Sequence, residues 1–269
     1  MLAVRYPPSC ACKSPIDINA GRGKLGLMPK SLPTIDGNAA FFVDFDGTLV
    51  EIAAKPHLVH VEPRVVAALE SLRQRLGGAV AIVTGRPLDL VDRLLAPLIL
   101  PTAAEHGLVH RDASGVVHVE DGALAGMEAA RSRLQTFAEA NPGLILERKM
   151  VSASLHYRQH PELGQACGVA AQAAIEGERG LEVLPGKMVF EVRPKGRNKG
   201  TAVEAFLNEP PFTGRLPIFA GDDVTDEAAF KVVKARGGIS IKIGDGDTVA
   251  DYRTDRDGLF AWAKTIAMP

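Results

Sequence analysis

"FFVDFDGTLV", residues 41–50, joins an apolar run to two aspartates, Asp44 and Asp46, and then to a Gly-Thr pair. A short apolar run rich in phenylalanine and valine is typical of a strand that is buried on both faces of a parallel sheet. Ligands of open parallel sheets bind beyond the carboxyl ends of the strands, which is where these aspartates lie. The stretch therefore predicts a central strand of an α/β protein with acidic chemistry at its end.

Short apolar runs alternate with helical periods from residue 39 onward. The pattern predicts strand, helix, strand, helix and strand in turn, over residues 39–45, 62–78, 79–85, 87–96 and 98–104. The same rhythm resumes after residue 195, with a helix at 199–209, a strand at 216–223, a helix from about 226 and a strand at 239–244. This order predicts an α/β fold with a Rossmann-like parallel sheet that is covered by helices.

The block at residues 108–194 interrupts this rhythm. It contains alternating strand patterns of its own and two helical stretches, around residues 123–139 and 162–176. We therefore expect an inserted α+β cap domain at residues 108–194, within a core formed by residues 39–107 and 195–269. Residues 1–38 are interrupted by prolines and glycines, and they are predicted to be a flexible N-terminal tail.

Composition and charge limit the kinds of partner. The chain has 269 residues, 46% hydrophobic and 23% charged, which is typical of folded domains with apolar cores. A net charge of −1 argues against nucleic acid or an anionic membrane as a partner, and residues 1–38 hold no apolar run of signal-peptide length. Three scattered cysteines, Cys10, Cys12 and Cys167, fit a reducing compartment, so we expect a cytoplasmic protein.

Carboxylates collect at the predicted edge of the sheet. Asp44 and Asp46 follow one strand, and the loop "GDDVTDE" after a later strand adds Asp222, Asp223 and Asp226. Acids placed so closely repel one another and raise each other's pKa unless a cation lies among them. Because the ligands are hard oxygens with no histidine or cysteine nearby, we expect that cation to be Mg²⁺.

The same edge offers the groups that phosphoryl transfer needs. Asp44, at the strand tip, is the candidate nucleophile, and Asp46, across a turn allowed by Gly47, is the candidate acid and base. Thr84 ends the second strand and Lys199 begins a helix, so we expect both to hold phosphoryl oxygens. The sequence therefore indicates a metal-dependent enzyme that acts on a small phosphate ester.

Four motifs in order, D-x-D-G-T, T-G-R, N-K-G and G-D-D-x-x-D-E, resemble those of the haloacid-dehalogenase superfamily of phosphotransferases. More narrowly, "DFDGTL", "VTGRP", "EHG", "LHYR", "GKMVFEVRP", "NKG" and "GDDVTDEAAF" resemble the trehalose-6-phosphate phosphatases, over about residues 40–265. The resemblance implies that Asp44 is the nucleophile, that Asp46 is the acid and base, and that Asp44, the Asp46 carbonyl and Asp222 hold Mg²⁺. It also implies trehalose 6-phosphate as the substrate, and trehalose-6-phosphate synthase as a partner enzyme in the same pathway.

Two strands of the expected cap each present a polar face. Alternation in "VSASLHYR" and "GKMVFEVRP" directs one set of polar side chains to the same side of its strand: His156, Arg158, Lys187, Glu191 and Arg193. This mixture of donors and an acceptor suits a polyol, although a solvated sheet face is the alternative on pattern alone. The family resemblance implies that Lys187 and Glu191 stand side by side and grip the second glucose ring.

The remaining candidates for substrate contact lie at the edge of the core sheet: Gly47, Thr48, Arg86, Glu105, His106, Asp223 and Asp226. For Arg86, Glu105 and His106, a structural role is the alternative. Other functions also stay open, namely a phosphatase or phosphomutase for another sugar phosphate, and a non-enzymatic sugar-phosphate sensor. The pair Asp44 and Asp46 argues against a sensor, because a sensor has no need for an acid and base.

Overall fold

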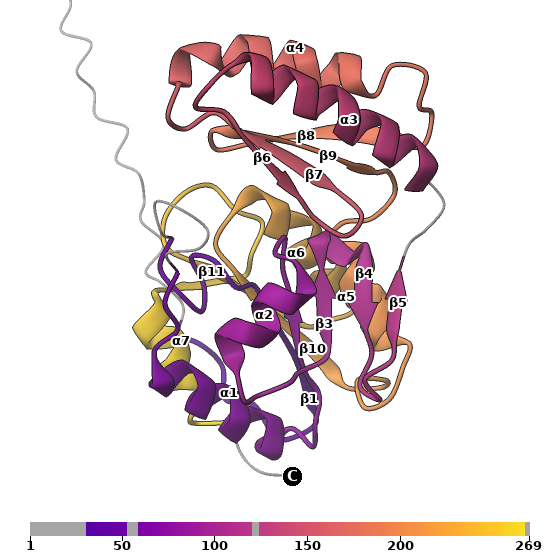
Figure 1. Ribbon diagram of the computed structural model, residues 1–269. Helices are drawn as coiled ribbons and strands as arrows, with labels where there is room; N and C mark the ends of the chain where they lie inside the picture. The colour runs from indigo at the N-terminus through magenta and orange to yellow at the C-terminus, as the bar shows by residue number, and fades with distance from the viewer. Residues whose placement is uncertain (1–30, 53–58, 120–123, 267–269) are drawn as a thin grey trace, which may run out of the picture.

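The computed structural model describes residues 31–52, 59–119 and 124–266 (Figure 1). Two sheets organise these residues, one of eight strands in the order β12-β11-β10-β1-β2-β3-β4-β5 and one of four in the order β6-β7-β9-β8. We call residues 124–194, with the smaller sheet, the cap, and the rest of the described chain the core. In Figure 1 the cap lies above the core, and its helices cover the side of its sheet that faces away from the core.

The centre of the core sheet is β1 (Ala39–Val43), every residue of which is buried. It pairs in parallel with β10 (Leu216–Gly221) and β2 (Val80–Val83), and the sheet continues through β11 (Ile239–Ile243) and β12 (Tyr252–Thr254) on one side and β3 (Thr102–Ala104) on the other. All these pairings are parallel, so the expected Rossmann-like α/β class is confirmed.

Helices cover both faces of the core sheet. They are α1 (Pro63–Arg75), α2 (Leu88–Leu95), α5 (Lys199–Leu207), α6 (Glu227–Ala235) and α7 (Arg256–Ala263). Two short 3-10 turns, η2 (Glu105–Gly107) and η4 (Val224–Asp226), also belong to the core, and η3 (Pro161–Leu163) belongs to the cap. Phe41 lies 6.4 Å from Trp262 of α7, whereas Phe42 stacks on Phe206 of α5 at 5.9 Å. Successive β1 side chains thus enter opposite hydrophobic layers, as the pleat of a strand requires.

The cap is an antiparallel sheet with two helices. Its elements are α3 (Leu124–Ala140), β6 (Ile145–Arg148), β7 (Ala153–His156), α4 (Gly164–Ala174), β8 (Leu181–Gly186) and β9 (Val189–Pro194). Leu155 and Val192 pack with Leu134 of α3 in an apolar core of the cap's own. The alternate residues Ser154 and Glu191 pair across β7 and β9, and Glu191 Oε1 lies 4.0 Å from Nε2 of His106 in the core, so this face of the cap sheet is the one toward the core.

Two predicted boundaries differ from the structure. The sequence pattern predicts a cap from residue 108, but β4 (Val109–Arg111) and β5 (Val117–Val119) continue the core sheet as an antiparallel hairpin beside β3. Alternation predicts a strand but not the sheet that it joins. Within the predicted tail, Ile35 is buried and Trp262 Nε1 donates to the Pro33 carbonyl at 2.7 Å, so residues 31–38 pack on the core. Residues 1–30 lie outside the described residues.

None of the helices within the described residues combines the length and the apolar character that a membrane span requires.

Candidate active site

The carboxyl end of β1 holds a buried ionic cluster. Asp44 follows the last residue of the strand, and its backbone N–H donates to the Ala220 carbonyl of β10 at 2.9 Å. Lys199, the first residue of α5, places its Nζ 2.8 Å from Asp44 Oδ1 and 2.7 Å from Asp226 Oδ1. Asn198 caps α5 by accepting from two backbone N–H groups, which fixes the helix start. The parallel topology thus joins β1, α5 and the loop after β10 at one point.

Asp226 organises the acidic loop that follows β10. Its Oδ2 accepts from the backbone N–H groups of Asp222 and Asp223, both at 2.9 Å, and its side chain is fully buried. Asp223 caps η4 by accepting from the backbone and hydroxyl of Thr225. Asp223 and Asp226 therefore hold the backbone of the loop, whereas the Asp222 carboxylate lies beside Gly47 and Thr48, after the end of β1.

The oxygens around Asp44 fit a small hard cation. One carboxylate oxygen each from Asp44, Asp222 and Asp226 lies within 4.8 Å of the others. Gly47 has a φ of +76°, and a Cβ built on it would overlap the Asp222 carboxylate, so only glycine leaves room for that carboxylate. Thr48 Oγ1 donates to Asp222 Oδ1 at 3.4 Å. The cluster can hold a metal, with Asp226 already committed to Lys199.

The electrostatics of the cluster also favour an added cation. Burial raises the pKa of Asp44 well above its ordinary value; Lys199 opposes this rise, whereas Asp226 and Asp222 add to it. Burial and repulsion from Asp226 and Asp223 raise the pKa of Asp222 to about 6. Burial alone would lower the pKa of Lys199, but attraction to Asp226 and Asp44 outweighs it and raises that pKa. Several carboxylates thus share one ammonium group, which an additional positive charge would relieve.

Asp46 lies in a tight pair with Arg86. The guanidinium Nε and Nη2 donate to the two carboxylate oxygens, both at 2.6 Å, in a bidentate arrangement. The Arg86 side chain is buried, and its carbon Cζ lies 5.5 Å from the centre of the Phe45 ring. Thr84, buried at the end of β2, accepts from the Arg86 backbone N–H at 3.2 Å. The structure thus gives Arg86 a partner on the protein, Asp46, where the sequence suggested the substrate.

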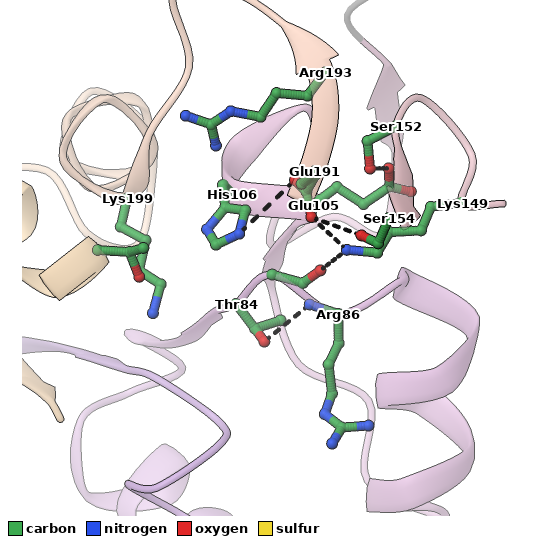
Figure 2. A network of polar contacts seen from close by, with 12 residues as sticks. Thr84, Arg86, Glu105, His106, Lys149, Ser152, Ser154, Glu191, Arg193 and Lys199 are labelled. Carbon is green, nitrogen blue, oxygen red and sulfur yellow. Dashed lines mark hydrogen bonds and ion pairs between the residues drawn. The ribbon is translucent and has the colours of Figure 1, made fainter. Parts of the chain in front are cut away.

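Glu191 of β9 is buried on the face of the cap sheet that lies toward the core. Its Oε2 accepts from Lys149 Nζ at 2.7 Å and from Ser154 Oγ at 3.2 Å (Figure 2). Its Oε1 is buried and has no hydrogen-bond partner among the described residues, and His106 Nε2 lies 4.0 Å away. Burial would raise the pKa of Glu191, but Lys149 and His106 outweigh it and lower that pKa to about 2. Glu191 is therefore an ionised carboxylate with one oxygen left for a ligand.

The prediction that Lys187 stands beside Glu191 is wrong. Lys187 lies in the turn between β8 and β9 and is exposed, and the next residue, Met188, has a φ of +62°. The alternation in the sequence continues through Lys187 and Met188, but the strands end at Gly186 and begin again at Val189, so the pleat that sets the face is interrupted there. The cation beside Glu191 is Lys149 instead, which follows β6, and no pattern in the sequence singled it out.

Three other cap candidates have different surroundings. His156 Nε2 pairs with Glu147 Oε2 at 2.9 Å within the cap sheet, and Arg158 is exposed beyond the end of β7. Arg193 is buried and donates from Nε to Glu182 Oε1 at 3.0 Å. In Figure 2 its guanidinium group extends toward the ring of His106. Of these, Arg193 is the one that the structure places near the cap–core boundary.

Glu105 and His106 form the strained turn η2 after β3. Both have positive φ, 47° and 60°, a conformation that costs non-glycine residues about 1 kcal/mol or more. Burial lowers the pKa of His106 to about 4, although Glu191 opposes this, so the ring is neutral near pH 7. Glu105 is fully buried and contacts the cap. A further residue that the sequence reasoning missed is Lys242, the one charged residue of β11, which donates to the Asp222 carbonyl; a lone lysine in a strand of isoleucines is the signal that could have indicated it.

A carboxylate at the central strand tip, a second acid two residues on, a threonine after the next strand and a lysine at a helix start define a class of protein. Their motifs resemble those of the haloacid-dehalogenase phosphotransferases, and the fold that carries them is shared with a solved phosphatase of that superfamily from Bacteroides thetaiotaomicron, which aligns with a TM-score of 0.57 at 18% identity. Residues 42–257 match the family model described as trehalose-phosphatase. The chain belongs to the trehalose-phosphatase family.

Individual relatives agree with this assignment. Trehalose-6-phosphate phosphatase of Escherichia coli (strain K12) is 38% identical over 238 residues, covering 87% of this chain and 88% of that protein. A probable trehalose-phosphate phosphatase of Sinorhizobium fredii is 42% identical over 218 residues, covering 80% and 81%. The crystal structure of a trehalose-6-phosphate phosphatase related protein aligns with a TM-score of 0.68 at 28% identity, covering 84% of this chain and 96% of that one.

Proposed function

We propose that the protein is a phosphoric monoester hydrolase that converts trehalose 6-phosphate into trehalose and phosphate. The observation that carries the proposal is the buried Asp44 carboxylate, held by Lys199 at the tip of β1 beside the acidic loop. Family membership supports the substrate class. A catalytically silent sensor would have no need to keep so costly a group of buried charges.

Asp44 acts as the nucleophile in this proposal. An oxygen of its carboxylate forms a bond to phosphorus, the bond from phosphorus to the sugar oxygen breaks, and an aspartyl phosphate results. Asp46 supplies the proton that the departing sugar oxygen takes up, and then accepts a proton from the water that hydrolyses the aspartyl phosphate. Lys199 and the Thr84 hydroxyl donate to the phosphoryl oxygens. Before it transfers a proton, Asp46 must release one of the two hydrogen bonds from Arg86.

The metal in this proposal is Mg²⁺. Asp44, Asp222 and the Asp46 backbone carbonyl would hold it, because hard oxygen donors of this kind suit that ion. When bound, it would neutralise negative charge on the carboxylates and the phosphoryl group. The overlap between a Cβ at Gly47 and the Asp222 carboxylate supports this reading, since it explains the glycine by the position of a metal ligand.

The cap supplies the proposed sugar specificity. Glu191 offers Oε1 to a sugar hydroxyl, and neutral His106 lies 4.0 Å away, where it can donate to the same ligand. An ionised carboxylate is a strong acceptor for hydroxyl groups. Lys187, at the tip of the β8–β9 turn, stays a candidate for contact with the distal ring. We further propose a cytoplasmic location and a pathway in which trehalose-6-phosphate synthase makes the substrate.

Phosphate release from a panel of sugar phosphates tests the proposal. The panel contains trehalose 6-phosphate, sucrose 6-phosphate, glucose 6-phosphate and mannose 6-phosphate, each with Mg²⁺ and again after chelation. We expect trehalose 6-phosphate to be hydrolysed with the highest kcat/KM, and chelation to stop the reaction. A preference for another sugar phosphate would contradict the substrate, and a requirement for an added sugar bisphosphate would indicate a phosphomutase.

A further inference from the structure

Strand β11 carries one charged side chain, that of Lys242. The sequence of the strand is Ile-Ser-Ile-Lys-Ile, and its isoleucines pack in or against the apolar core, whereas Ser240 and Lys242 alternate with them. Lys242 is nevertheless buried. Because removing an ammonium group from water is unfavourable unless protein groups replace the water, the fold must provide this lysine with a partner.

That partner lies at the end of the neighbouring strand. Lys242 is in register with Gly221, the last residue of β10, and its ammonium group donates to the backbone carbonyl of the next residue, Asp222. The side chain therefore reaches across to the start of the acidic loop. The parallel pairing of β10 with β11 brings the two residues to the same edge of the sheet.

This hydrogen bond completes the hold on one peptide group. The peptide that links Asp222 to Asp223 has its carbonyl bound by Lys242, and its N–H donates to Asp226 Oδ2 at 2.9 Å. The same Oδ2 atom accepts from the N–H of Asp222, also at 2.9 Å. The backbone of Asp222 is thus fixed on both sides of its Cα atom, and the direction in which its side chain leaves the chain is fixed with it.

The Asp222 carboxylate itself is held less firmly. Thr48 Oγ1 donates to its Oδ1 at 3.4 Å, which is longer than the usual range of about 2.5–3.0 Å for such a bond. The other two members of the cluster, Asp44 and Asp226, repel it when they are ionised. The place of this carboxylate in the cluster therefore depends on how its backbone is held.

We propose that Lys242 is a positioning residue that holds the backbone of Asp222, so that the Asp222 carboxylate faces the metal site beside Asp44. The proposal rests on the proposed function, which assigns Asp222 as a ligand of Mg²⁺. Groups that orient a metal ligand typically change the affinity for the metal about 10- to 100-fold when they are removed. Because the ammonium group binds a backbone carbonyl, its loss should weaken metal binding and spare the reaction at saturating metal.

A purely structural role for Lys242 gives a different expectation. Replacing a buried charge by an apolar residue of similar volume is often tolerated, because the cost of burying the charge is removed with it. Lys242→Met should therefore fold, and the Asp222 carbonyl would lose its donor. If Lys242 only supported the strand, the change would alter the stability of the protein and leave its affinity for Mg²⁺ as it is.

The test compares Lys242→Met with Lys234→Met in the full chain. Lys234 of α6 is a matched control, because its Nζ also donates to a backbone carbonyl, that of Val249 in the loop after β11, at 2.7 Å. Isothermal titration calorimetry with Mg²⁺ and no substrate measures the affinity without any dependence on activity. We expect the Kd for Mg²⁺ to rise about 10- to 100-fold in Lys242→Met and to stay within about twofold in Lys234→Met.

The Mg²⁺ dependence of phosphate release gives a kinetic readout of the same effect. In Lys242→Met we expect the half-saturating Mg²⁺ concentration to rise with the Kd, whereas kcat at saturating Mg²⁺ should stay within about threefold of the wild-type value. Lys242→Arg keeps a cationic donor and should recover part of the affinity. An unchanged Kd in folded Lys242→Met, or an equal rise in Lys234→Met, would overturn the proposal.

Amide hydrogen exchange reports on the peptide group itself. We expect exchange at the Asp223 amide, measured without metal, to accelerate about tenfold in Lys242→Met and to stay unchanged in Lys234→Met. Equal exchange in both variants would mean that Lys242 does not hold this peptide, and it would refute the proposed role.

Two further outcomes are separable. If Lys242→Met does not fold, NMR of the lysine ammonium groups in the wild-type protein replaces it: Mg²⁺ should shift the Nζ signal of Lys242 and not that of Lys234, and an unshifted Lys242 signal would contradict the link. If the wild-type protein prefers another sugar phosphate, the proposed substrate fails, while the Mg²⁺ affinities still judge Lys242. Full activity after chelation would refute the metal and this role together.

Discussion

Replacing Lys199 with methionine tests the centre of the proposed site, because the two side chains have similar length and differ in charge. Lys199 lies 2.8 Å from Asp44 and 2.7 Å from Asp226, and all three are buried. Removing one partner of a buried ion pair leaves an uncompensated charge and costs about 3–5 kcal/mol of stability. The cost can be measured by denaturant unfolding followed through Trp262, the single tryptophan, which packs against β1.

The same change should also remove activity. Without the Lys199 ammonium, the pKa of Asp44 rises further, so a smaller fraction is ionised and able to attack phosphorus. Loss of one donor to the phosphoryl group should lower kcat by a further factor of about a hundred to a thousand. As a control, Lys234→Met removes a part-exposed ion pair with Asp251, which should cost less than about 1 kcal/mol. If Lys199→Met kept its stability within 1 kcal/mol and its kcat within about tenfold, Lys199 would have no such central role.

Four further variants test separate parts of the site. Asp44→Asn should abolish phosphate release while the circular dichroism spectrum stays unchanged, because the amide is nearly isosteric but cannot attack phosphorus; residual turnover would remove Asp44 as the nucleophile. Gly47→Ala should weaken Mg²⁺ activation, since the new methyl group overlaps the Asp222 carboxylate, and an unchanged activation curve would contradict that placement. Glu191→Gln should lower kcat/KM for trehalose 6-phosphate about tenfold or more and affect p-nitrophenyl phosphate much less, whereas equal losses would point to a role in folding. The low pKa of His106, about 4, means that the unfolded chain binds a proton that the folded chain does not between about pH 6.5 and 4. Stability should therefore fall by about 3 kcal/mol as the pH drops through this window, and His106→Gln should remove that part of the pH dependence.

Topology explains which parts of the site were predictable. Apolar runs identified β1, β2 and β10, and parallel strands bring their carboxyl ends to one edge, so Asp44 and Asp222 could be placed together from sequence. The Asp46–Arg86 pair also joins that edge, but its bidentate geometry depends on side-chain rotamers that no spacing encodes. Periodicity therefore located the groups but not their partners.

The periodicity of the sequence could not predict the contacts that the cap makes. Lys149 lies in a turn, where no face is defined, and its two partners come from β9 and from the loop after β2. Glu105 occupies a positive-φ position that is rare for glutamate and that follows from the packed turn rather than from local preference. The prediction for Lys187 is wrong for a related reason. The alternation in the sequence includes Lys187, but this residue lies between the end of β8 and the start of β9.

The pairing of β1 with β10 has a consequence for the order in which the protein is made. Ala39 lies beside Leu216, so the central strand leaves the ribosome long before the strand that covers one of its edges. The cap has a sheet, helices and an apolar cluster of its own within residues 124–194, and its contacts are closer in sequence. Domains fold as units during synthesis, so we expect the cap to fold before β10, β11 and β12 of the core have been synthesised. During that interval β1 has an open edge, which makes the nascent core the part of the chain most in need of a chaperone.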